Sequence, residues 1–272
     1  MKRPLFCELC PFAFRLSRLK GVLLRKLKDA LSPQKFCKEK TAQALPHCIA
    51  THASLIRRKL AGVNEELQEN KAKNLALAAP CINGVLIRPG ETFSFWHLVG
   101  NTTAKKGYLP GLFIACGKPQ AGIGGGMCQM TNLLHWMVLH SELTITEHHH
   151  HERFNLFPDA ERQVPFGLGT SIAYNYLDYR VTNNTTRTYQ FLLYTDGEYL
   201  RGELRADAPQ ELKYSIRVGN DRFVKENEVI YRCGDIYRDT TQADGTVCRT
   251  EHLLRTHAQV MYEVPQEQLS DN

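Results

Sequence analysis

A glycine-rich segment ahead of a cysteine constrains this chain more than any other feature. Residues 122–129 are Gly-Ile-Gly-Gly-Gly-Met-Cys-Gln, and residues 130–140 continue with helix-compatible apolar spacing and without proline or glycine. Because glycine lacks a Cβ atom, such a run lets the backbone turn tightly, adopt positive φ and approach another group closely. The sequence therefore predicts a tight turn through residues 124–126 that brings Cys128 into the first turn of a helix.

A cysteine in this position has two interpretations. A thiol in the first turn of a helix meets the positive end of the helix dipole and several unpaired N–H groups, which favour the thiolate. In the reactive interpretation Cys128 is a nucleophile, His151 is its base and Asp178 orients the histidine, in the chain order of papain-like thiol hydrolases. In the other interpretation Cys128 is a structural residue, because free cysteine is among the most buried residue types.

The residues next to Cys128 receive roles that depend on the same choice. Gln129 and the N–H groups of Gly124, Gly125 and Gly126 are suited to hold an oxyanion. The glycines are alternatively a cradle for a phosphate. They are not a P-loop, because no Lys-Ser or Lys-Thr pair follows them.

Four consecutive histidines follow Glu147 at positions 148–151. Adjacent residues cannot all point one way, so the run is either a polar loop or a source of one or two site residues. His149 and Glu91 are predicted to line the ligand site beside the glycines. A metal held by Cys128 and two histidines is a further alternative. We predict that the site binds no metal and no cofactor.

The composition is that of an ordinary globular protein. Of the 272 residues, 43% are hydrophobic and 23% are charged, which suits one large or two modest domains. The nine cysteines are odd in number and scattered, which favours reduced thiols over a disulfide framework. No run of about 18 apolar residues occurs, and the N-terminus lacks an uninterrupted apolar stretch. We therefore expect no transmembrane helix, no secretory signal and a cytoplasmic location.

Positive charge is concentrated at the N-terminus. Residues 1–35 contain nine Lys and Arg but only Glu8 and Asp29 as acids, whereas the whole chain has a net charge of +6. Within residues 12–31, apolar side chains recur every three or four positions, which predicts a basic amphipathic helix. This helix either contacts an anionic membrane surface or packs its apolar stripe on the core. Nucleic acid is not expected, because DNA-binding motifs and aromatic-rich basic repeats are missing. The stripe consists of Phe12, Leu16, Leu19, Leu23, Leu27 and Leu31.

The cysteines near the N-terminus match only half of the spacing pattern of a zinc site. Cys7 and Cys10 have the C-x2-C spacing of half a zinc site, and Cys37 with Cys48 or His47 would have to complete it. These later residues do not repeat the C-x2-C spacing that such sites use. We therefore predict free thiols here and no metal.

The coarse pattern of elements predicts an α+β fold. Residues 52–79 have helical spacing, and Pro80 should end that helix. Turn signals surround a short strand within 82–95, and Asp196-Gly197 predicts a hairpin between two strands. The other expected β segments are a hairpin at 107–118, a strand at 171–181, the hairpin strands 188–194 and 199–206, and short strands within 211–264.

We expect N-terminal helices, then a mixed or antiparallel sheet with a central helix that starts at the Gly-Gly-Gly-Met-Cys-Gln segment. This arrangement divides the chain into four parts. They are a basic amphipathic segment (1–35), a helical lead-in (36–80), a core (81–185) and an antiparallel β extension packed on the core (186–264).

Several motifs match a known family in the same order. They are Ile-Arg-Pro-Gly-Glu-Thr-Phe-Ser-Phe at 87–95, Gly-Tyr at 107–108, Gly-Gly-Gly-Met-Cys-Gln at 124–129 and Leu-Asp-Tyr at 177–179. On these residues, the segment 83–184 resembles the VanW family, and the similarity extends upstream through 69–71 and 74–75. Where the family often has Glu-Arg-His-x-His, this chain aligns His149 and His151 with the two histidines. Residues 169–171, Gly-Thr-Ser, stand where the family commonly has Asp-Ala-Thr.

The resemblance implies a bacterial protein linked to vancomycin resistance or cell-wall metabolism, closer to the stand-alone form of the family than to its long secreted forms. It implies no particular reaction. Two functions are therefore expected as alternatives. The first is a thiol enzyme that uses Cys128, His151 and Asp178 on an amide or ester of a peptidoglycan precursor. The second is a non-catalytic protein that binds such a precursor or a resistance enzyme.

Overall fold

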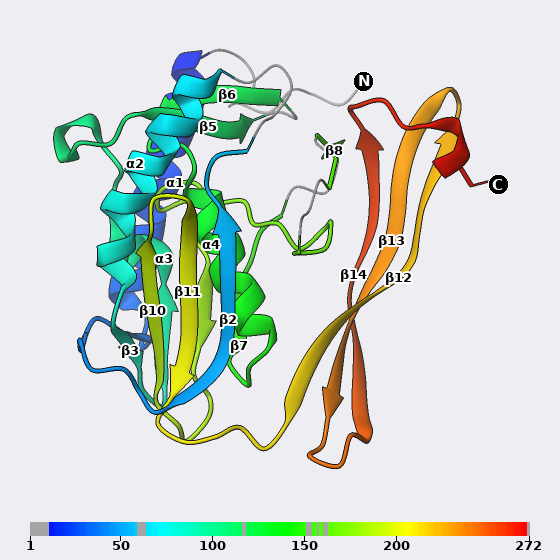
Figure 1. Ribbon diagram of the computed structural model, residues 1–272. Coiled ribbons are helices and arrows are strands. Elements are labelled where there is room, and N and C mark those ends of the chain that lie inside the picture. The colour runs from blue at the N-terminus through cyan, green and yellow to red at the C-terminus, as the bar shows by residue number, and fades with distance from the viewer. Residues whose placement is uncertain are drawn as a thin grey trace.

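The chain forms an α+β body and a long three-stranded β-ribbon beside it (Figure 1). The computed structural model describes residues 11–58, 64–115, 118–150, 154–156, 158–159 and 163–270. Helices and two four-stranded sheets of the body enclose the main hydrophobic core. This confirms the predicted α+β class, including a helix that starts within the glycine-rich motif.

The first sheet of the body has the strand order β2-β11-β10-β3, and every neighbouring pair is antiparallel. Alternate residues of β11 are buried, as expected for a strand with one covered face. Helix α4 packs closely on this sheet at Gly202, where a Cβ atom would lie 2.4 Å from Leu133 Cδ2. The elements are β2 (His47–Leu55), β3 (Val85–Ile87), β10 (Tyr189–Thr195), β11 (Tyr199–Ala206), and the helices α2 (Glu65–Ile82) and α4 (Met127–Leu139).

The second sheet of the body has the order β1-β4-β9-β7, in which only the β1–β4 pair is parallel. Phe93 of β4 meets Phe191 of the first sheet edge-on, with ring centroids 5.1 Å apart. Both rings are fully buried, so the two sheets share one core. The strands are β1 (Lys35–Phe36), β4 (Glu91–Ser94), β7 (Thr144–Glu147) and β9 (Arg180–Thr182).

A buried asparagine on α2 ties together the segments that lead into α4. Asn74 Nδ2 donates to Leu109 O and to Gly125 O at 2.9 Å each, and Asn74 Oδ1 accepts from Leu109 N at 2.8 Å. Its amide therefore satisfies backbone groups on both sides of the hairpin that precedes α4. The connecting elements are α3 (Phe95–Val99), η2 (Ala104–Lys106), β5 (Pro110–Ala115) and β6 (Lys118–Ile123).

The ribbon is a long antiparallel sheet with one short parallel strand at its edge. The ribbon meets the body through a small hydrophobic cluster formed by Leu139, Val164, Leu168 and Ile236. Arg238 crosses the same junction, where it donates to Ser141 O. The strands are β12 (Lys213–Glu226), β13 (Val229–Thr241), β14 (Val247–Val260) and β8 (Phe154–Asn155), and η3 (Gln266–Gln268) follows them.

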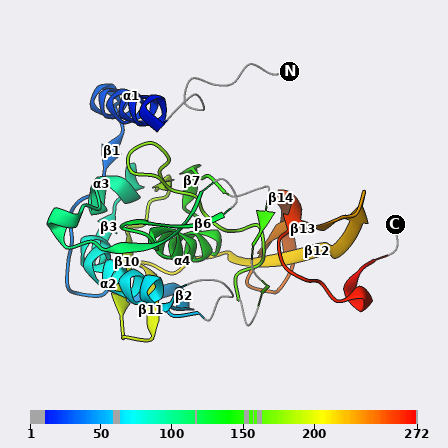
Figure 2. The ribbon, with the colours of Figure 1, turned by 90° about the horizontal axis from the view of Figure 1, so that it is seen from above.

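Helix α1 (Pro11–Leu31) lies along the outer side of the body, as the view from above shows (Figure 2). In the part of the chain that the structure describes, its charged contacts to the body are two ion pairs, and Gly21 packs beside the Tyr176 ring. Arg25 pairs with Glu147 at 2.5 Å, and Asp29 pairs with Arg180 at 2.6 Å. The predicted amphipathic helix is thus confirmed, but it does not dock through its apolar stripe.

Several elements differ from the sequence prediction. Residues 47–55 form β2, whereas a helix was expected from residue 52, because β11 supplies backbone partners along the whole segment. Pro80 lies inside the last turn of α2, which ends at Ile82 with the Asn83 N–H bonded to Ala79 O. The segment 171–181 contains a short turn closed by a bridge between Ala173 and Leu177, and β9 starts only at Arg180.

The expected division of the chain also changes in its last part. The hairpin β10–β11 completes the first sheet between β2 and β3, so a boundary at residue 185 would cut through one sheet. The three strands that follow are long, where short ones were expected, because they pair with one another along most of their length. The extension from the body therefore begins after Ala206.

In the described part of the chain, no helix combines the length and the apolar character that crossing a membrane requires.

Candidate functional site

The glycine segment forms the predicted turn at the start of α4. Gly124 has φ +74° and Gly126 has φ +104°, and Gly126 is the N-cap residue of α4. Gly125 does not need positive φ. It needs the absence of a side chain, because a Cβ atom would lie 2.1 Å from Gly111 O. The three glycines thus serve two tasks, a left-handed turn and a close approach to β5.

Cys128 lies in the first turn of α4, as predicted, and keeps a little exposed surface. The backbone N–H groups of Ile172 and of Cys128 itself act to lower the pKa of the thiol, which favours the thiolate. Burial outweighs both and raises the pKa of the Cys128 thiol. Among the described residues, no histidine is hydrogen-bonded to this thiol. The helix start alone therefore does not make Cys128 acidic.

A threonine from the segment after β8 is fixed against the same side of α4. Asn132 Oδ1 accepts from both the N–H and the hydroxyl of Thr170, at 2.6 and 2.8 Å. The Thr170 hydroxyl also contacts the Thr131 hydroxyl and lies 3.4 Å from Cys128 O. These bonds hold the backbone of residues 170–172 beside the thiol, and so explain how the Ile172 N–H reaches it.

Two turns along the helix, histidines continue this polar surface. His135 stacks on His148 with ring centroids 4.1 Å apart, and His148 stacks on His150 at 5.5 Å. Burial lowers the pKa of His135 well below its ordinary range, and burial together with the neighbouring His150 lowers the pKa of His148 to about 4. The His135–His148 pair is therefore neutral at physiological pH. Neutral imidazoles can both donate and accept hydrogen bonds.

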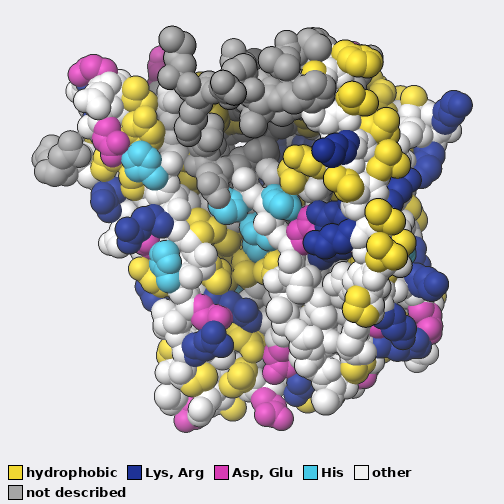
Figure 3. Space-filling model, turned by 180° about the vertical axis from the view of Figure 1, so that it is seen from behind, with side chains coloured by type: hydrophobic (Ala, Val, Ile, Leu, Met, Phe, Trp, Pro, Cys, Tyr) yellow, Lys and Arg dark blue, Asp and Glu magenta, His cyan; other side chains and the backbone are white. Residues whose placement is uncertain are grey.

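Two buried polar atoms in this region, His148 Nε2 and Ser171 Oγ, have no hydrogen-bond partner among the residues that the structure describes. Their segments are joined directly, because Ser171 N donates to His149 O at 2.6 Å. Buried polar atoms in native proteins are nearly always paired, so two unpaired atoms on joined segments point to a ligand or ordered water. Histidine side chains gather in the middle of the face shown in Figure 3, next to α1. We call Cys128, Asn132, His135, His148, Thr170 and Ser171 the α4 polar cluster.

Glu147 joins this region to α1 and to the second sheet. Its carboxylate pairs with Arg25, accepts from Asp178 N at 2.9 Å and lies 3.0 Å from His149 Nε2. These partners outweigh its burial and lower its pKa. His149 therefore lies at the edge of the cluster, where its imidazole faces a carboxylate.

Asp178 is fully buried and has other partners than the predicted histidine. It accepts from Ser94 Oγ at 2.5 Å, from the N–H groups of Trp96 and Tyr179, and from Arg180 Nε at 2.9 Å. Because Ser94 is the N-cap of α3, the carboxylate stabilises a helix start and a buried arginine. His151 lies outside the described residues, so its pairing with Cys128 or Asp178 stays a prediction.

Two further predicted site residues have structural partners. The Gln129 amide donates toward Ser54 O, Ser54 Oγ and Leu55 O of β2, which uses both of its protons and leaves none for an oxyanion. Glu91 accepts from Arg88 N at 3.0 Å and pairs with Lys35 at 2.9 Å. It closes the turn before β4. Among the described residues, these contacts do not include the α4 polar cluster.

Two residues of the site region were not predicted. His135 follows Cys128 by seven positions, so helical spacing placed both on one side of α4. Lys71 of α2 packs on the glycine turn, where a Cβ atom on Gly126 would lie 2.3 Å from Lys71 Cγ. Burial and the nearby Arg58 and Arg57 lower the pKa of Lys71 to about 8. No sequence pattern signals a buried lysine at this point.

Comparison with known proteins shows where the chain belongs. The family model described as VanW like protein matches residues 70–205, which contain Lys71, the glycine turn, α4 and the whole α4 polar cluster. The chain belongs to the VanW-like family. Helix α1 and the ribbon lie outside the VanW-like region, which ends at the last strand of the first sheet.

Two known proteins are similar to this chain over different lengths. The vancomycin B-type resistance protein VanW of Enterococcus faecalis strain V583 is 37% identical over 200 residues, which cover 73% of this chain and 72% of that protein. The uncharacterized protein YoaR of Bacillus subtilis strain 168 is 31% identical over 115 residues, covering 42% of this chain and 36% of YoaR. No solved structure matches the chain.

Apart from the α4 polar cluster, a cavity lies where the ribbon joins the body. It has a volume of about 610 Å³ and is lined by side chains of β2, the C-terminal end of α4 and the start of β12. Trp136 and His140 meet there, with ring centroids 4.6 Å apart. The groove combines flat rings with polar side chains, as ligand pockets do.

Proposed function

We propose that this chain is a VanW-like accessory protein of glycopeptide resistance or cell-wall metabolism that binds a peptidoglycan precursor at the α4 polar cluster. The observation that carries the proposal is that two buried atoms of the cluster, His148 Nε2 and Ser171 Oγ, have no hydrogen-bond partner among the described residues, and that their segments are joined by the bond from Ser171 N to His149 O. A hydroxyl or amide of a precursor would supply the missing hydrogen bonds. The link to resistance comes from the similarity to the Enterococcus faecalis protein.

Binding fits the cluster better than thiol catalysis does. Burial raises the pKa of Cys128, and both amide protons of Gln129 are used on β2. A nucleophilic cysteine needs the opposite conditions, an acidic thiol and a donor for the oxyanion. A neutral His148 needs no change of charge to accept a polar ligand.

Calorimetry with a soluble nucleotide-linked muramyl pentapeptide tests the proposal. The double variant His148→Gln/Ser171→Ala should lose at least about tenfold in affinity. The buried polar groups of the ligand would then lack hydrogen-bond partners in the protein. His252→Gln on the ribbon is the matched control and should bind as the wild-type protein does. No binding by the wild-type protein, or equal binding by the double variant, would overturn the proposal.

A thiol enzyme that uses Cys128, His151 and Asp178 on an amide or ester of the same precursor is the second candidate. It is favoured by the backbone N–H groups of Ile172 and Cys128, which act to lower the pKa of the Cys128 thiol. In such a reaction the thiolate attacks the carbonyl carbon, the amine or alcohol leaves with a proton, and water then hydrolyses the acyl-enzyme. An acyl adduct on Cys128, detected by mass spectrometry and lost in His151→Ala, would establish this candidate. Its absence would leave precursor binding as the function.

We further propose that α1 holds the protein on an anionic membrane surface. The helix docks on the body through Arg25 and Asp29, four residues apart and therefore on one side of the helix. Gly21 belongs to this docking side as well, because a Cβ atom there would lie 2.6 Å from the ring of Tyr176. The side of α1 that faces the protein is thus polar or small.

The opposite side of α1 is apolar and exposed. At 100° per residue, Leu23 and Leu27 lie about 200° around the helix from Arg25 and Asp29. Figure 3 shows apolar side chains in a stripe along α1, with Lys and Arg beside them. Seven large apolar side chains of this helix are 46–77% exposed, namely Phe12, Leu16, Leu19, Leu23, Leu24, Leu27 and Leu31.

The charges flanking this stripe argue for an anionic lipid surface as its partner. Arg18, Lys20, Lys26 and Lys28 are exposed, whereas the acidic Asp29 is turned inward to Arg180. An exposed apolar stripe with a basic border is the pattern of helices that lie in the membrane interface. A membrane location would also bring the protein to lipid-linked precursors.

Sedimentation with vesicles tests the membrane contact. The protein should bind vesicles of phosphatidylglycerol and phosphatidylcholine, bind phosphatidylcholine vesicles much more weakly, and dissociate partly at high salt. The variant Leu19→Ser/Leu23→Ser/Leu27→Ser should lose binding, whereas Leu77→Ser on α2, also an exposed leucine, should keep it. The proposal would be contradicted if the wild-type protein did not bind anionic vesicles. It would also be contradicted if the wild-type protein were a dimer and the triple variant a monomer.

A further inference from the structure

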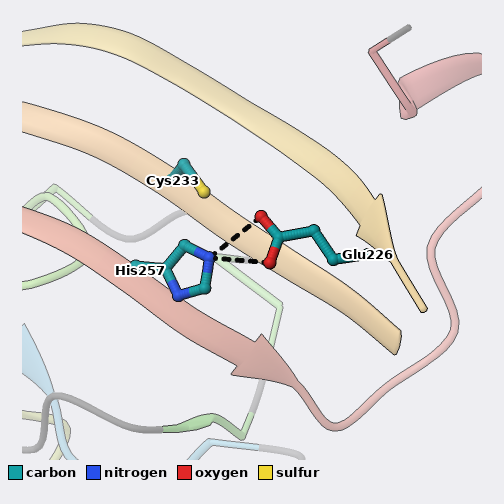
Figure 4. Close-up of side chains that lie close together, drawn as sticks. All are labelled: Glu226, Cys233 and His257. Carbon is teal, nitrogen blue, oxygen red and sulfur yellow. Dashed lines mark hydrogen bonds and ion pairs between the residues drawn. The ribbon is translucent and has the colours of Figure 1, made fainter. Parts of the chain in front are cut away.

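A cysteine, a histidine and a glutamate meet on one end of the ribbon, far along the chain from the α4 polar cluster. Cys233 on β13 and His257 on β14 are direct partners in the strand register, so their side chains lie on the same face. Glu226 is the last residue of β12 and reaches the same point (Figure 4). One ligand atom from each residue lies within 4.8 Å of the other two.

The local structure holds the three side chains in place. Asn227 and Glu228 both have positive φ, 48° and 65°, which makes a tight hairpin and returns the chain from Glu226 to β13. The His257 ring stacks on Tyr231 with centroids 4.4 Å apart. His257 Nε2 lies 3.1 and 3.2 Å from the two oxygens of Glu226. The histidine therefore already points its nitrogen at the carboxylate and the thiol.

An ion pair between His257 and Glu226 is the simplest account of two of these residues. Both side chains are about half exposed, and an exposed pair of this kind contributes little stability. It also leaves the Cys233 sulfur beside them unexplained. A thiolate, an imidazole nitrogen and a carboxylate within a few ångströms form the ligand combination that zinc prefers.

We propose that Glu226, Cys233 and His257 form a binding site for a divalent transition metal, with zinc as the natural ion. Zinc would displace the proton of the Cys233 thiol to solvent and bind the neutral nitrogen of His257 in place of the His257–Glu226 contact. Three protein ligands leave a fourth tetrahedral position for water or for a partner's side chain. The site lies outside the VanW-like region and so belongs to the ribbon of this chain.

The position of the site gives the metal a structural consequence. The three ligands come from three consecutive strands, so one ion would join β12, β13 and β14 near the hairpin end of the ribbon. Among the described residues, a bridge between Phe223 and Leu269 and the short parallel strand β8 pair with the ribbon near that end. Bound zinc should therefore stabilise the ribbon in particular, since a ligand that binds only the folded state raises its stability.

Cobalt titration of the untagged, reduced protein tests the proposal directly. Cobalt bound by a thiolate has a near-ultraviolet charge-transfer band, and a tetrahedral site has intense visible bands. Wild-type protein should show both at one equivalent, and zinc should remove them by competition. Cys233→Ser should abolish the charge-transfer band, and His257→Ala should weaken cobalt binding by at least about tenfold.

Cys248→Ser is the matched control, because Cys248 is an exposed thiol on the same ribbon and is not one of the three ligands. It should titrate like the wild-type protein. A wild-type protein without the charge-transfer band, or an unchanged band in Cys233→Ser, would overturn the metal site. Thermal denaturation gives a second readout, in which zinc raises the Tm of wild-type protein and Cys248→Ser but not of Cys233→Ser.

Discussion

The imidazole rings of His135 and His148 stack with their planes 16° apart and their centroids 4.1 Å apart. The first ring belongs to the helix that follows the glycine turn, and the second belongs to the histidine run. Burial lowers the pKa of both rings, so the stack holds only while both are neutral. A proton on either ring would place an unpaired charge in a buried site.

The stack predicts how stability depends on pH. Burial lowers the pKa of His148 from 6.5 to about 4 in the folded protein, so the unfolded chain binds the proton more readily. The neutral His148 ring makes its full contribution to the free energy of unfolding above about pH 6.5. This contribution decreases as the pH falls toward 4. The loss is on the order of 3 kcal/mol, since one pKa unit is worth about 1.4 kcal/mol.

Urea denaturation of wild-type protein and His148→Gln between pH 7 and 4.5 measures this effect. The wild-type free energy of unfolding should fall more steeply, so the difference between the two proteins should shrink as the pH decreases. Parallel curves would show that His148 does not take up the proton on unfolding.

Gly125→Ala should destabilise the protein more than an ordinary glycine substitution does. The new Cβ atom would lie 2.1 Å from the carbonyl oxygen of Gly111, and neither backbone can move freely because Asn74 bonds to both segments. We expect a loss of about 3 kcal/mol or more. Gly90→Ala is the control, since Gly90 has φ +77° and no atom within 4 Å of its Cβ position, and it should cost about 1 kcal/mol. Equal losses in thermal or urea unfolding would contradict the close approach.

The Cys128 thiol should react slowly with iodoacetamide at neutral pH. Burial raises its pKa and limits its access, whereas Cys248 is exposed on the ribbon. Mass spectrometry of partly alkylated protein should therefore find Cys248 modified well before Cys128. The reverse order, together with a loss of Cys128 reactivity in His151→Ala, would establish the ion pair that the thiol enzyme requires.

Asp178→Asn should be strongly destabilising. The carboxylate is buried and pairs with Arg180, which is itself buried. The substitution therefore removes a negative charge that balances the buried guanidinium. We expect a loss of about 3–5 kcal/mol. Glu39→Gln removes the partner of Arg88 in an exposed pair and should change the free energy of unfolding far less. Similar midpoints for both variants in urea denaturation would show that Asp178 is dispensable for folding.

The sequence by itself determined the elements whose cause is local. The glycine turn and the start of α4 follow from the residues at 124–129, and the β10–β11 hairpin follows from Asp196-Gly197. The helical spacing of residues 12–31 was likewise sufficient to predict α1. Each of these depends on backbone conformations and periodicities that neighbouring residues set among themselves.

Tertiary structure decided which partners these elements meet. Periodicity places Leu23 and Leu27 on one side of α1, but only the ion pairs of Arg25 and Asp29 turn that side away from the body. Residues 47–55 become a strand because β11, about 150 positions later in the chain, offers its backbone. Such outcomes depend on contacts between distant segments, which local propensity does not contain.

The candidate site divides in the same way. The position of Cys128 at a helix start was predictable, whereas its raised pKa comes from burial, which depends on how distant segments pack around the thiol. Asp178 lay in the expected chain order, yet Ser94 and Arg180 occupy its carboxylate. Chain order limits which residues can meet, but packing and desolvation determine which ones do and with what charge.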